Sequence, residues 1–204
     1  MDGPSDGRPS DTADDAAIVA CVLRGEKQQF EHLVRRYQQF LYRHALTIVL
    51  DHDVASDMVQ DAFVRAYLNL RECRDHSRFR AWLFRTLRNR CLDHLKEPGR
   101  RNVRLDDVAE PLLDVTHAPG TLAERNEVRR GIRRALAKLP PALREAFIMH
   151  YVDGMSYDAM AELLDVSVSA LKMRALRARE ALRSALRHGD VTDKASVSSL
   201  YETP

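Results

Sequence analysis

Apolar residues recur every three or four positions along two long stretches of the chain, residues 14–97 and 122–187. In the first stretch Phe30, Leu33 and Tyr37 are typical of the spacing. Such spacing places the apolar side chains on one face of a helix, where they can pack into a core. No stretch alternates with period two for long, so the pattern predicts an all-α fold without strands.

Proline, glycine and aspartate interrupt the helical pattern between these stretches. Residues 98–121 contain three prolines and two glycines, which favour turns over regular helix, so this segment is predicted to be a flexible linker. Residues 1–13 are predicted to be a disordered acidic tail, and residues 188–204 a loose polar tail. The expected organisation is therefore an N-terminal helical bundle over 14–97 and a second helical domain over 122–187.

The second domain contains a helix-turn-helix pattern in residues 156–180, SYDAMAELLDVSVSALKMRALRARE. A short helix over 156–164, capped by Ser156, is predicted to meet a turn at 165–167 and a longer helix. The expected core between the helices is Met160, Leu164, Val166 and Leu171. The second helix is basic, as expected of one that enters a major groove, although an ordinary hairpin with a basic surface fits the pattern too.

Just before this motif, Pro140 and Pro141 are predicted to open a helix that ends at Gly154.

Charge is unevenly distributed in this chain of 204 residues, whose formal net charge is only +2. Arginines are concentrated in residues 71–104 and 125–187, which indicates a polyanionic partner. A solvated, salt-bridged helix surface would also explain this concentration of charge. The first fifteen residues hold five aspartates and one arginine, and they could compete with nucleic acid for the basic faces.

Several protein classes are disfavoured by what the sequence lacks. Its three cysteines are far apart, so no disulfide framework or zinc site is expected. No apolar run reaches the roughly 18 residues of a membrane span, and no signal peptide precedes the first helix, so a cytoplasmic location without membrane insertion is expected. No phosphate loop, His-Glu-x-x-His motif or carboxylate cluster appears, and the scattered histidines suit surface or boundary positions. We therefore expect neither an enzyme nor a bound cofactor or metal.

Two segments of the first domain carry candidate interfaces. In residues 53–70, DVASDMVQDAFVRAYLNL, Asp53 is expected to cap a helix, and Asp57, Gln60, Asp61 and Arg65 share a polar face that could also be a plain solvent face. In residues 71–96, arginines interleave with Phe79, Trp82 and Phe84. Such a mixture suits a phosphate backbone and unstacked bases, although Phe79, Trp82 and Leu83 could instead belong to the core.

Three motifs resemble those of the extracytoplasmic-function class of bacterial sigma factors. Residues 139–183, with Leu-Pro-Pro, Gly-Met-Ser-Tyr and Arg-Ala-Arg-Glu, are similar to the domain that reads the −35 promoter element. Residues 57–63 match the Asp-x-x-Gln-(Glu/Asp)-x-Phe core of the helix that binds a coiled coil on the polymerase β′ subunit. The Phe-Arg-Ala-Trp-Leu-Phe-Arg run at 79–85 is similar to the helix that melts and captures the −10 element.

The resemblance assigns roles to residues by position. Polymerase binding would involve Asp57, Gln60, Asp61, Phe63 and Arg65. Binding of the −10 element would involve Arg74, Asp75, His76, Ser77, Arg80, Trp82, Arg85, Arg88 and Arg100. Binding of the −35 element would involve Ser169, Lys172, Met173, Arg174 and Arg177. The chain departs from the family at the turn, where Asp165 replaces the usual glycine; aspartate tolerates the left-handed backbone better than most residues.

The resemblance implies a transcription initiation factor that binds the β′ and β subunits of core RNA polymerase and directs the enzyme to promoter DNA. An anti-sigma protein is a further expected partner. The alternative is a stand-alone helix-turn-helix regulator, because that motif alone does not determine function. Such a regulator would need a dimer interface and would bind duplex DNA tightly without polymerase.

Overall fold

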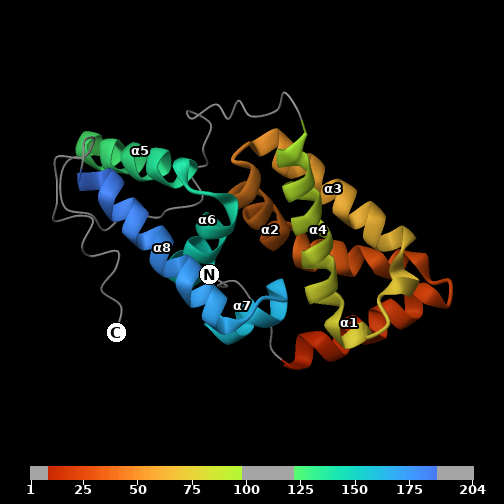
Figure 1. Cartoon of the computed structure of the whole chain (residues 1–204). Helices are drawn as coiled ribbons and strands as arrows, with labels where there is room; N and C mark the ends of the chain where they lie inside the picture. The colour runs from red at the N-terminus through yellow and green to blue at the C-terminus, as the bar shows by residue number, and fades with distance from the viewer. Residues whose placement is uncertain (1–8, 98–121, 188–204) are drawn as a thin grey trace. The chain divides into compact units, whose positions relative to one another are not determined.

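The computed structural model describes residues 9–97 and 122–187, and these residues form helices joined by short turns, with no strand among them (Figure 1). They fall into two compact units, essentially the helices α1–α4 and the helices α5–α8, which are described separately below. The all-helical fold class predicted from the hydrophobic pattern is confirmed. The linker predicted over 98–121 and the tail predicted over 188–204 lie outside the described residues.

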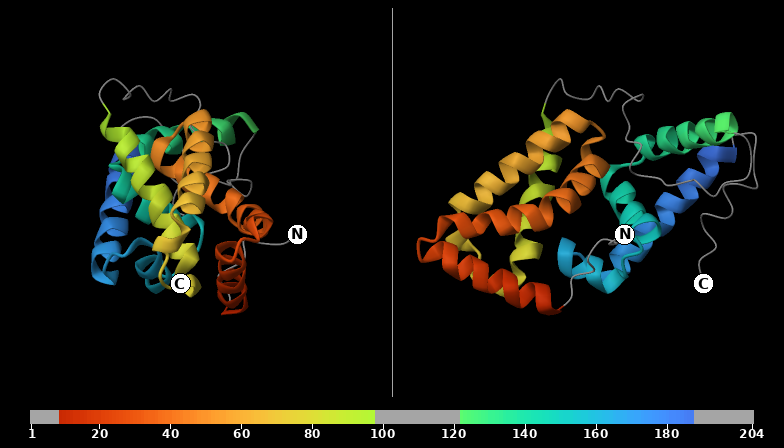
Figure 2. Two further views of the ribbon diagram at one scale, coloured as in Figure 1. Left: turned by 90° about the vertical axis from the view of Figure 1, so that its right-hand side faces the viewer. Right: turned by 180° about the vertical axis from the view of Figure 1, so that it is seen from behind.

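The first unit contains four helices and three short 3-10 turns. A hairpin bend at Gly25, whose φ of 110° suits glycine, joins the first two helices, which diverge from it (Figure 2). In chain order the elements are α1 (Pro9–Leu23), η1 (Lys27–Gln29), α2 (Phe30–Val49), α3 (His52–Leu68), η2 (Leu70–Glu72), η3 (His76–Arg78) and α4 (Phe79–Lys96).

The core of this unit is rich in aromatic rings. Phe79, the first residue of α4, is fully buried, and its ring centroid lies 6.5 Å from that of Phe30 and 6.3 Å from that of Tyr37. Phe84 is also fully buried and packs against His44, whose ring centroid is 4.0 Å away. The aromatic residues of α4 therefore mainly support the fold.

Helix α1 is fastened to α2 by a buried carboxylate. Asp15 is 1 % exposed; its Oδ1 accepts a hydrogen bond from Arg36 at 2.5 Å, and its Oδ2 accepts one from the Tyr37 hydroxyl. Burial raises the pKa of Asp15, and these two hydrogen bonds oppose the rise. The same guanidinium also binds Asp14. Both aspartates at this end of the acidic segment thus have partners within the fold.

The boundary of the predicted N-terminal tail needs correction. Helix α1 begins at Pro9, within the span 1–13 that was expected to be disordered, while residues 1–8 lie outside the described residues. Proline is well suited to a first helical turn, since the amide hydrogen that it lacks has no partner there.

The N-terminus of α3 also differs from expectation. This helix begins at His52, so Asp53 lies in the first turn and complements the helix dipole instead of capping it.

The second unit contains α5 (Leu122–Lys138), α6 (Pro141–Phe147), a π-helical turn η6 (Ile148–Val152), α7 (Tyr157–Leu164) and α8 (Val168–Arg187). Helix α6 packs along α8, whose inner face is formed by small or apolar side chains that are at most 1 % exposed. These inner residues are Leu171, Ala175, Ala178 and Leu182.

The predicted helix-turn-helix is present with its local signals. Ser156 caps α7 by accepting a hydrogen bond from the Ala159 amide at 3.2 Å. Asp165 ends α7 with φ 56° and ψ 47°, the left-handed conformation expected of it. Of the four predicted core residues, Met160, Leu164 and Leu171 are buried, whereas Val166 is only half-buried because it lies in the turn.

The helix predicted to begin at the proline pair is also confirmed. Pro141 is the first residue of α6, and the π-helical turn that continues it is followed by Gly154 at φ 69°.

A buried arginine links α6 to the end of α5. Arg144 is 3 % exposed, and its Nη1 donates to the carbonyl oxygens of Leu136, Ala137 and Leu139, each at 3.3 Å. These carbonyls lie at a helix C-terminus, where few amide donors remain, although the Leu136 carbonyl also accepts from the Leu139 amide at 3.0 Å. Burial lowers the pKa of Arg144 to about 10 and Glu145 opposes the fall, so the side chain is still cationic at neutral pH.

We expect Arg144→Met to destabilise the second unit by about 2–3 kcal/mol, because buried carbonyls lose a charged donor. Urea unfolding followed by circular dichroism would show an earlier transition. The only tryptophan, Trp82, lies in the first unit, so the transition in its fluorescence should not move. Arg130→Met, at an exposed position of α5, is the matched control. Equal stability of the two variants would contradict this role for Arg144.

Candidate protein-docking and nucleic-acid interfaces

Helix α3 presents a stripe of exposed side chains at intervals of three and four residues. Asp57 and Gln60 are exposed, Val64 is 56 % exposed and Leu68 is 72 % exposed. We call these four residues the α3 stripe. The two apolar members were not among the residues predicted to bind polymerase. The sequence does contain a signal for them, because α3 has more apolar residues than a single buried face requires. An apolar pair one turn apart on an exposed helix face suits a protein partner.

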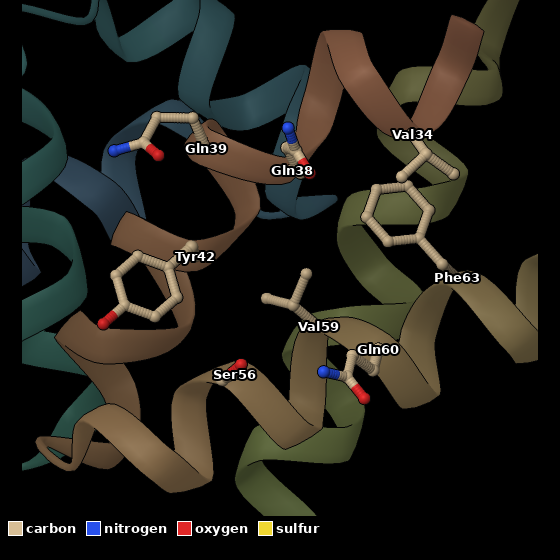
Figure 3. Close-up of a pocket in the computed structure, with 8 residues that line it drawn as sticks. All are labelled: Val34, Gln38, Gln39, Tyr42, Ser56, Val59, Gln60 and Phe63. Atoms are coloured by element: carbon tan, nitrogen blue, oxygen red, sulfur yellow. The ribbon is translucent and has the colours of Figure 1, made fainter. Parts of the chain in front are cut away.

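A groove lies beside this stripe, between α2 and α3 (Figure 3). Its volume is about 410 Å³, and Val34, Val59 and Phe63 contribute apolar surface to its lining. The rest of the lining carries amide and hydroxyl groups without a formal charge. These polar residues are Gln38, Gln39, Tyr42, Ser56 and Gln60. Such a lining can hydrogen-bond to polar side chains or backbone of a partner while covering its apolar surface.

Asp61 has a different environment from its neighbours on the predicted polar face. Its Oδ2 accepts hydrogen bonds from Arg65 Nε at 2.9 Å and from Arg90 Nε, on α4, at 2.5 Å. Although partial burial opposes it, hydrogen bonding to these guanidinium groups lowers the pKa of Asp61. Asp61 therefore ties α3 to α4 through Arg90, and the exposed Arg65 is its second partner.

Phe63, also predicted to flank the polymerase interface, lies largely in the core. It is 8 % exposed, and its ring meets that of Phe30 edge-on at a centroid distance of 6.4 Å. Of the five residues predicted for polymerase binding, Asp57 and Gln60 are exposed without an ion pair among the described residues.

The segment before α4 is a short turn held by its own side chains. Asp75 caps η3: its Oδ1 accepts hydrogen bonds from the Ser77 amide at 3.0 Å and the Ser77 hydroxyl at 2.5 Å. The Ser77 hydroxyl lowers the pKa of Asp75 below its usual value. Arg74 is exposed and His76 is half-buried. The conformation of this turn is therefore fixed by hydrogen bonds within the turn itself.

Four of the residues predicted to bind the −10 element lie on α4, and all four are half-buried. The Arg80 guanidinium lies over the ring of Phe40 on α2, 5.2 Å from its centroid, and Trp82, Arg85 and Arg88 are half-buried as well. Phe79 and Phe84 are fully buried and cannot stack on a base, which leaves Trp82 as the accessible aromatic residue among the three considered. Arg100 lies outside the described residues.

Helix α8 exposes most of the predicted −35 residues. Ser169, Lys172, Met173 and Arg177 are exposed, whereas Arg174 is half-buried and its Nη1 has no hydrogen-bond partner among the described residues. Ser167, not singled out from the sequence, begins this helix by accepting a hydrogen bond from the Ala170 amide at 3.3 Å. Together these residues form a basic surface at the start of a helix, as the helix-turn-helix motif requires.

The described residues contain no cluster of three or more side chains that could hold a metal ion. In the same part of the chain, no helix is both long and apolar enough to cross a bilayer.

Two histidines differ from expectation. His44 and His94, expected at surface or boundary positions, are 6 % and 9 % exposed and belong to the core of the first unit.

Comparisons with known protein families match both units. Residues 33–101 match the family model for sigma-70 region 2, and residues 129–182 match that for sigma-70 region 4. Two helical units with these signatures define the sigma factors, the subunits that give RNA polymerase its promoter specificity.

Individual relatives place the chain more narrowly. It is 33 % identical to the RNA polymerase sigma-H factor of Pseudomonas aeruginosa over 84 % of its length and 93 % of that protein. It is also 33 % identical to the ECF RNA polymerase sigma-E factor of Escherichia coli K12, over 85 % of its length and 94 % of the relative. The chain belongs to the extracytoplasmic-function sigma factors of the sigma-70 family, and it is a promoter-specific transcription initiation factor.

Solved structures agree with this assignment. CnrH, in a complex with the cytosolic domain of CnrY, is 30 % identical with a TM-score of 0.61, covering 85 % of this chain and 97 % of CnrH. The sigma factor RpoE of Bartonella quintana, in a complex with the anti-sigma factor NepR, is 26 % identical with a TM-score of 0.56, covering 79 % of this chain and 98 % of that protein.

The bridging role of Asp61 predicts a pH-dependent loss of stability. We expect Asp61→Asn to destabilise the first unit by about 1 kcal/mol at neutral pH, because two partly exposed ion pairs are lost. The lowered pKa of Asp61 means that its contribution is present above the ordinary value of 3.8 and disappears as the pH falls through the folded-state value. Urea unfolding monitored by Trp82 fluorescence from about pH 7 to about pH 3 measures this difference.

Asp57→Asn, on the same helix and exposed, should leave the unfolding free energy unchanged. If both substitutions have the same effect, or if the effect of Asp61→Asn persists unchanged in acid, Asp61 does not join α3 to α4 as described.

Proposed function

We propose that the two units divide the work of promoter recognition. The first, over residues 14–97, binds core RNA polymerase and captures the melted −10 element. The second, over residues 122–187, reads the −35 element, and residues 98–121 link them. The observation that carries this proposal is an exposed stripe with two apolar side chains on α3, in a chain that matches both sigma-70 regions.

Polymerase docking is proposed for the α3 stripe together with the α2–α3 groove. The stripe offers Leu68 and Val64 as apolar anchors and Gln60 as a hydrogen-bonding group beside the groove. A coiled coil of the polymerase β′ subunit is the proposed occupant, since a helix pair can lay an apolar ridge along such a stripe. Asp61 supports this surface by pairing with Arg65 on the same helix and with Arg90 on α4.

Capture of the −10 element is proposed for η3 and the first half of α4. Arg74 and Ser77 stand at the preformed turn, Arg80 is held over Phe40, and Trp82 offers a partly accessible ring. Basic side chains would follow the phosphate backbone of the opened strand while the ring or the turn holds an unstacked base.

Reading of the −35 element is proposed for the exposed face of α8. Ser169, Lys172 and Arg177 are directed outward near the start of the helix, where such motifs contact base edges and phosphates. Arg174 contributes from a half-buried position, and Met173, 48 % exposed, is suited to an apolar contact such as a thymine methyl.

Regulation by an anti-sigma protein is part of the proposal, because both solved relatives are in a complex with a partner and one of these partners is named an anti-sigma factor. We place the protein in the cytoplasm, where its polymerase and promoter partners are. The catalytic chemistry is that of the polymerase, and this chain is proposed to supply no catalytic group or cofactor of its own.

Leu68→Glu tests the docking surface. Leu68 is 72 % exposed, so the change should not affect the fold, but a carboxylate would replace an apolar anchor in the interface. Burial of a leucine side chain contributes about 1.5–3 kcal/mol, so we expect polymerase affinity to fall roughly 10- to 100-fold. Titration of labelled protein with core polymerase measures the affinity, and run-off transcription from a promoter library measures the function.

Ala17→Glu, which introduces the same charge at an exposed position of α1, should retain full affinity. Unaltered polymerase binding by Leu68→Glu would remove the α3 stripe from the interface. An absence of transcripts with any promoter in the library, despite tight polymerase binding, would argue against promoter-directed initiation.

A further inference from the structure

One side chain on the proposed −35 surface is held in place by an aromatic residue from another helix. The Lys172 ammonium on α8 lies 5.8 Å from the ring centroid of Tyr157, the first residue of α7. An ammonium group at this distance over an aromatic face is attracted to the negative face of the ring. Tyr157 was not predicted to take part in any interface.

Tyr157 is in turn stacked on a histidine. The rings of Tyr157 and His150 are nearly parallel, with an interplanar angle of 29° and centroids 4.0 Å apart. His150 Nδ1 lies 2.9 Å from the carbonyl oxygen of Met155. Since a carbonyl oxygen can only accept, Nδ1 carries the hydrogen, and this bond fixes the orientation of the imidazole ring.

The π-helical turn η6 places this histidine. Its backbone carries His150 and Tyr151 side by side, with the ring of Tyr151 edge-on to that of His150 at 4.8 Å. Tyr151 rests on the buried Phe147, whose ring centroid is 5.0 Å away. Rings therefore connect the core of the second unit to the surface at Lys172. Single π-helical turns are rare and occur often at functional sites.

Lysine has a long, flexible side chain, so an exposed lysine alone would sample many positions. We propose that Tyr157, supported by His150, is a positioning residue that orients Lys172 toward a DNA phosphate on the −35 surface. The inference rests on the proposed role of α8 and gives Tyr157 and His150 a role in DNA binding that neither the family resemblance nor the exposed face of α8 assigned to them. The ring, and not the hydroxyl, performs this role.

The test is a double-mutant cycle with the complete chain bound to core polymerase. The ligand is a labelled duplex from a promoter that this holoenzyme transcribes, cut upstream of the −10 element so that no strand opening contributes. Dissociation constants are measured over a range of KCl concentrations for Lys172→Ala, Tyr157→Leu and the double variant. Tyr157→Phe and His150→Phe are the conservative variants, and Arg177→Ala, on the same exposed face, is the matched control.

We expect Tyr157→Leu to weaken binding about 2- to 5-fold, the effect of one exposed cation–π contact. Lys172→Ala should reduce the slope of log affinity against log salt by about one, as expected for the loss of one phosphate contact. In the Tyr157→Leu background the effect of Lys172→Ala should shrink, whereas the effect of Arg177→Ala should be unchanged. Tyr157→Phe should bind like the unmodified protein, whereas His150→Phe, which lacks the hydrogen bond to the Met155 carbonyl that orients the ring, should weaken binding less than Tyr157→Leu does.

Two results would overturn the inference and leave the role of α8 intact. One is strict additivity of Lys172→Ala and Tyr157→Leu. The other is an equal loss of the Arg177 contribution in the Tyr157→Leu background, which would show general damage to the domain. If Lys172→Ala alone changes neither affinity nor salt slope, then Lys172 does not contact DNA, and that part of the proposed function fails together with the inference.

Discussion

Edge-to-face packing of aromatic rings around Phe30 holds the first unit together and connects its two proposed interfaces. The Phe30 ring lies 6.4 Å from that of Phe63 and 5.3 Å from that of Tyr67 on α3, and 6.5 Å from that of Phe79 at the start of α4. Helix α3 carries the α3 stripe proposed for polymerase docking, and Phe79 directly follows the turn proposed for the −10 element. Because edge-on rings interlock, a shift of one helix would disturb the other.

Charged groups reinforce this arrangement at the edges of the core. Asp61 joins α3 to α4 through Arg90, and Asp15 joins α1 to α2 through Arg36 and Tyr37. In the second unit the buried Arg144 has a comparable role, because its guanidinium donates a hydrogen bond to a carbonyl at the end of α5. From the sequence alone, these charged residues would be expected at the surface. In the structure they hold the helices in place, so that the exposed side chains form a rigid binding surface.

Local features of the structure could be predicted from the sequence, and contacts between distant residues could not. Helical periodicity, the Ser156 cap and the left-handed Asp165 depend on neighbouring residues, and all three are present. The pairing of Asp61 with Arg90 spans 29 positions and leaves no mark on local spacing. Phe63 and Val64 are adjacent in sequence, yet the first is buried and the second exposed. Helix α3 has apolar residues on more than one side, so the pattern alone did not identify the face that meets the core.

We propose that this chain opens promoter DNA only when it is docked on polymerase. Unstacking of bases costs a few kcal/mol, which small faces on two separate units do not readily supply in a free protein. Permanganate footprinting of a promoter with the protein alone, with core polymerase alone and with both measures strand opening directly. Reactive thymines near the start site are predicted only when both are present. Tight, sequence-specific duplex binding by the protein alone, unchanged by polymerase and without reactive thymines, would instead identify a free-standing regulator.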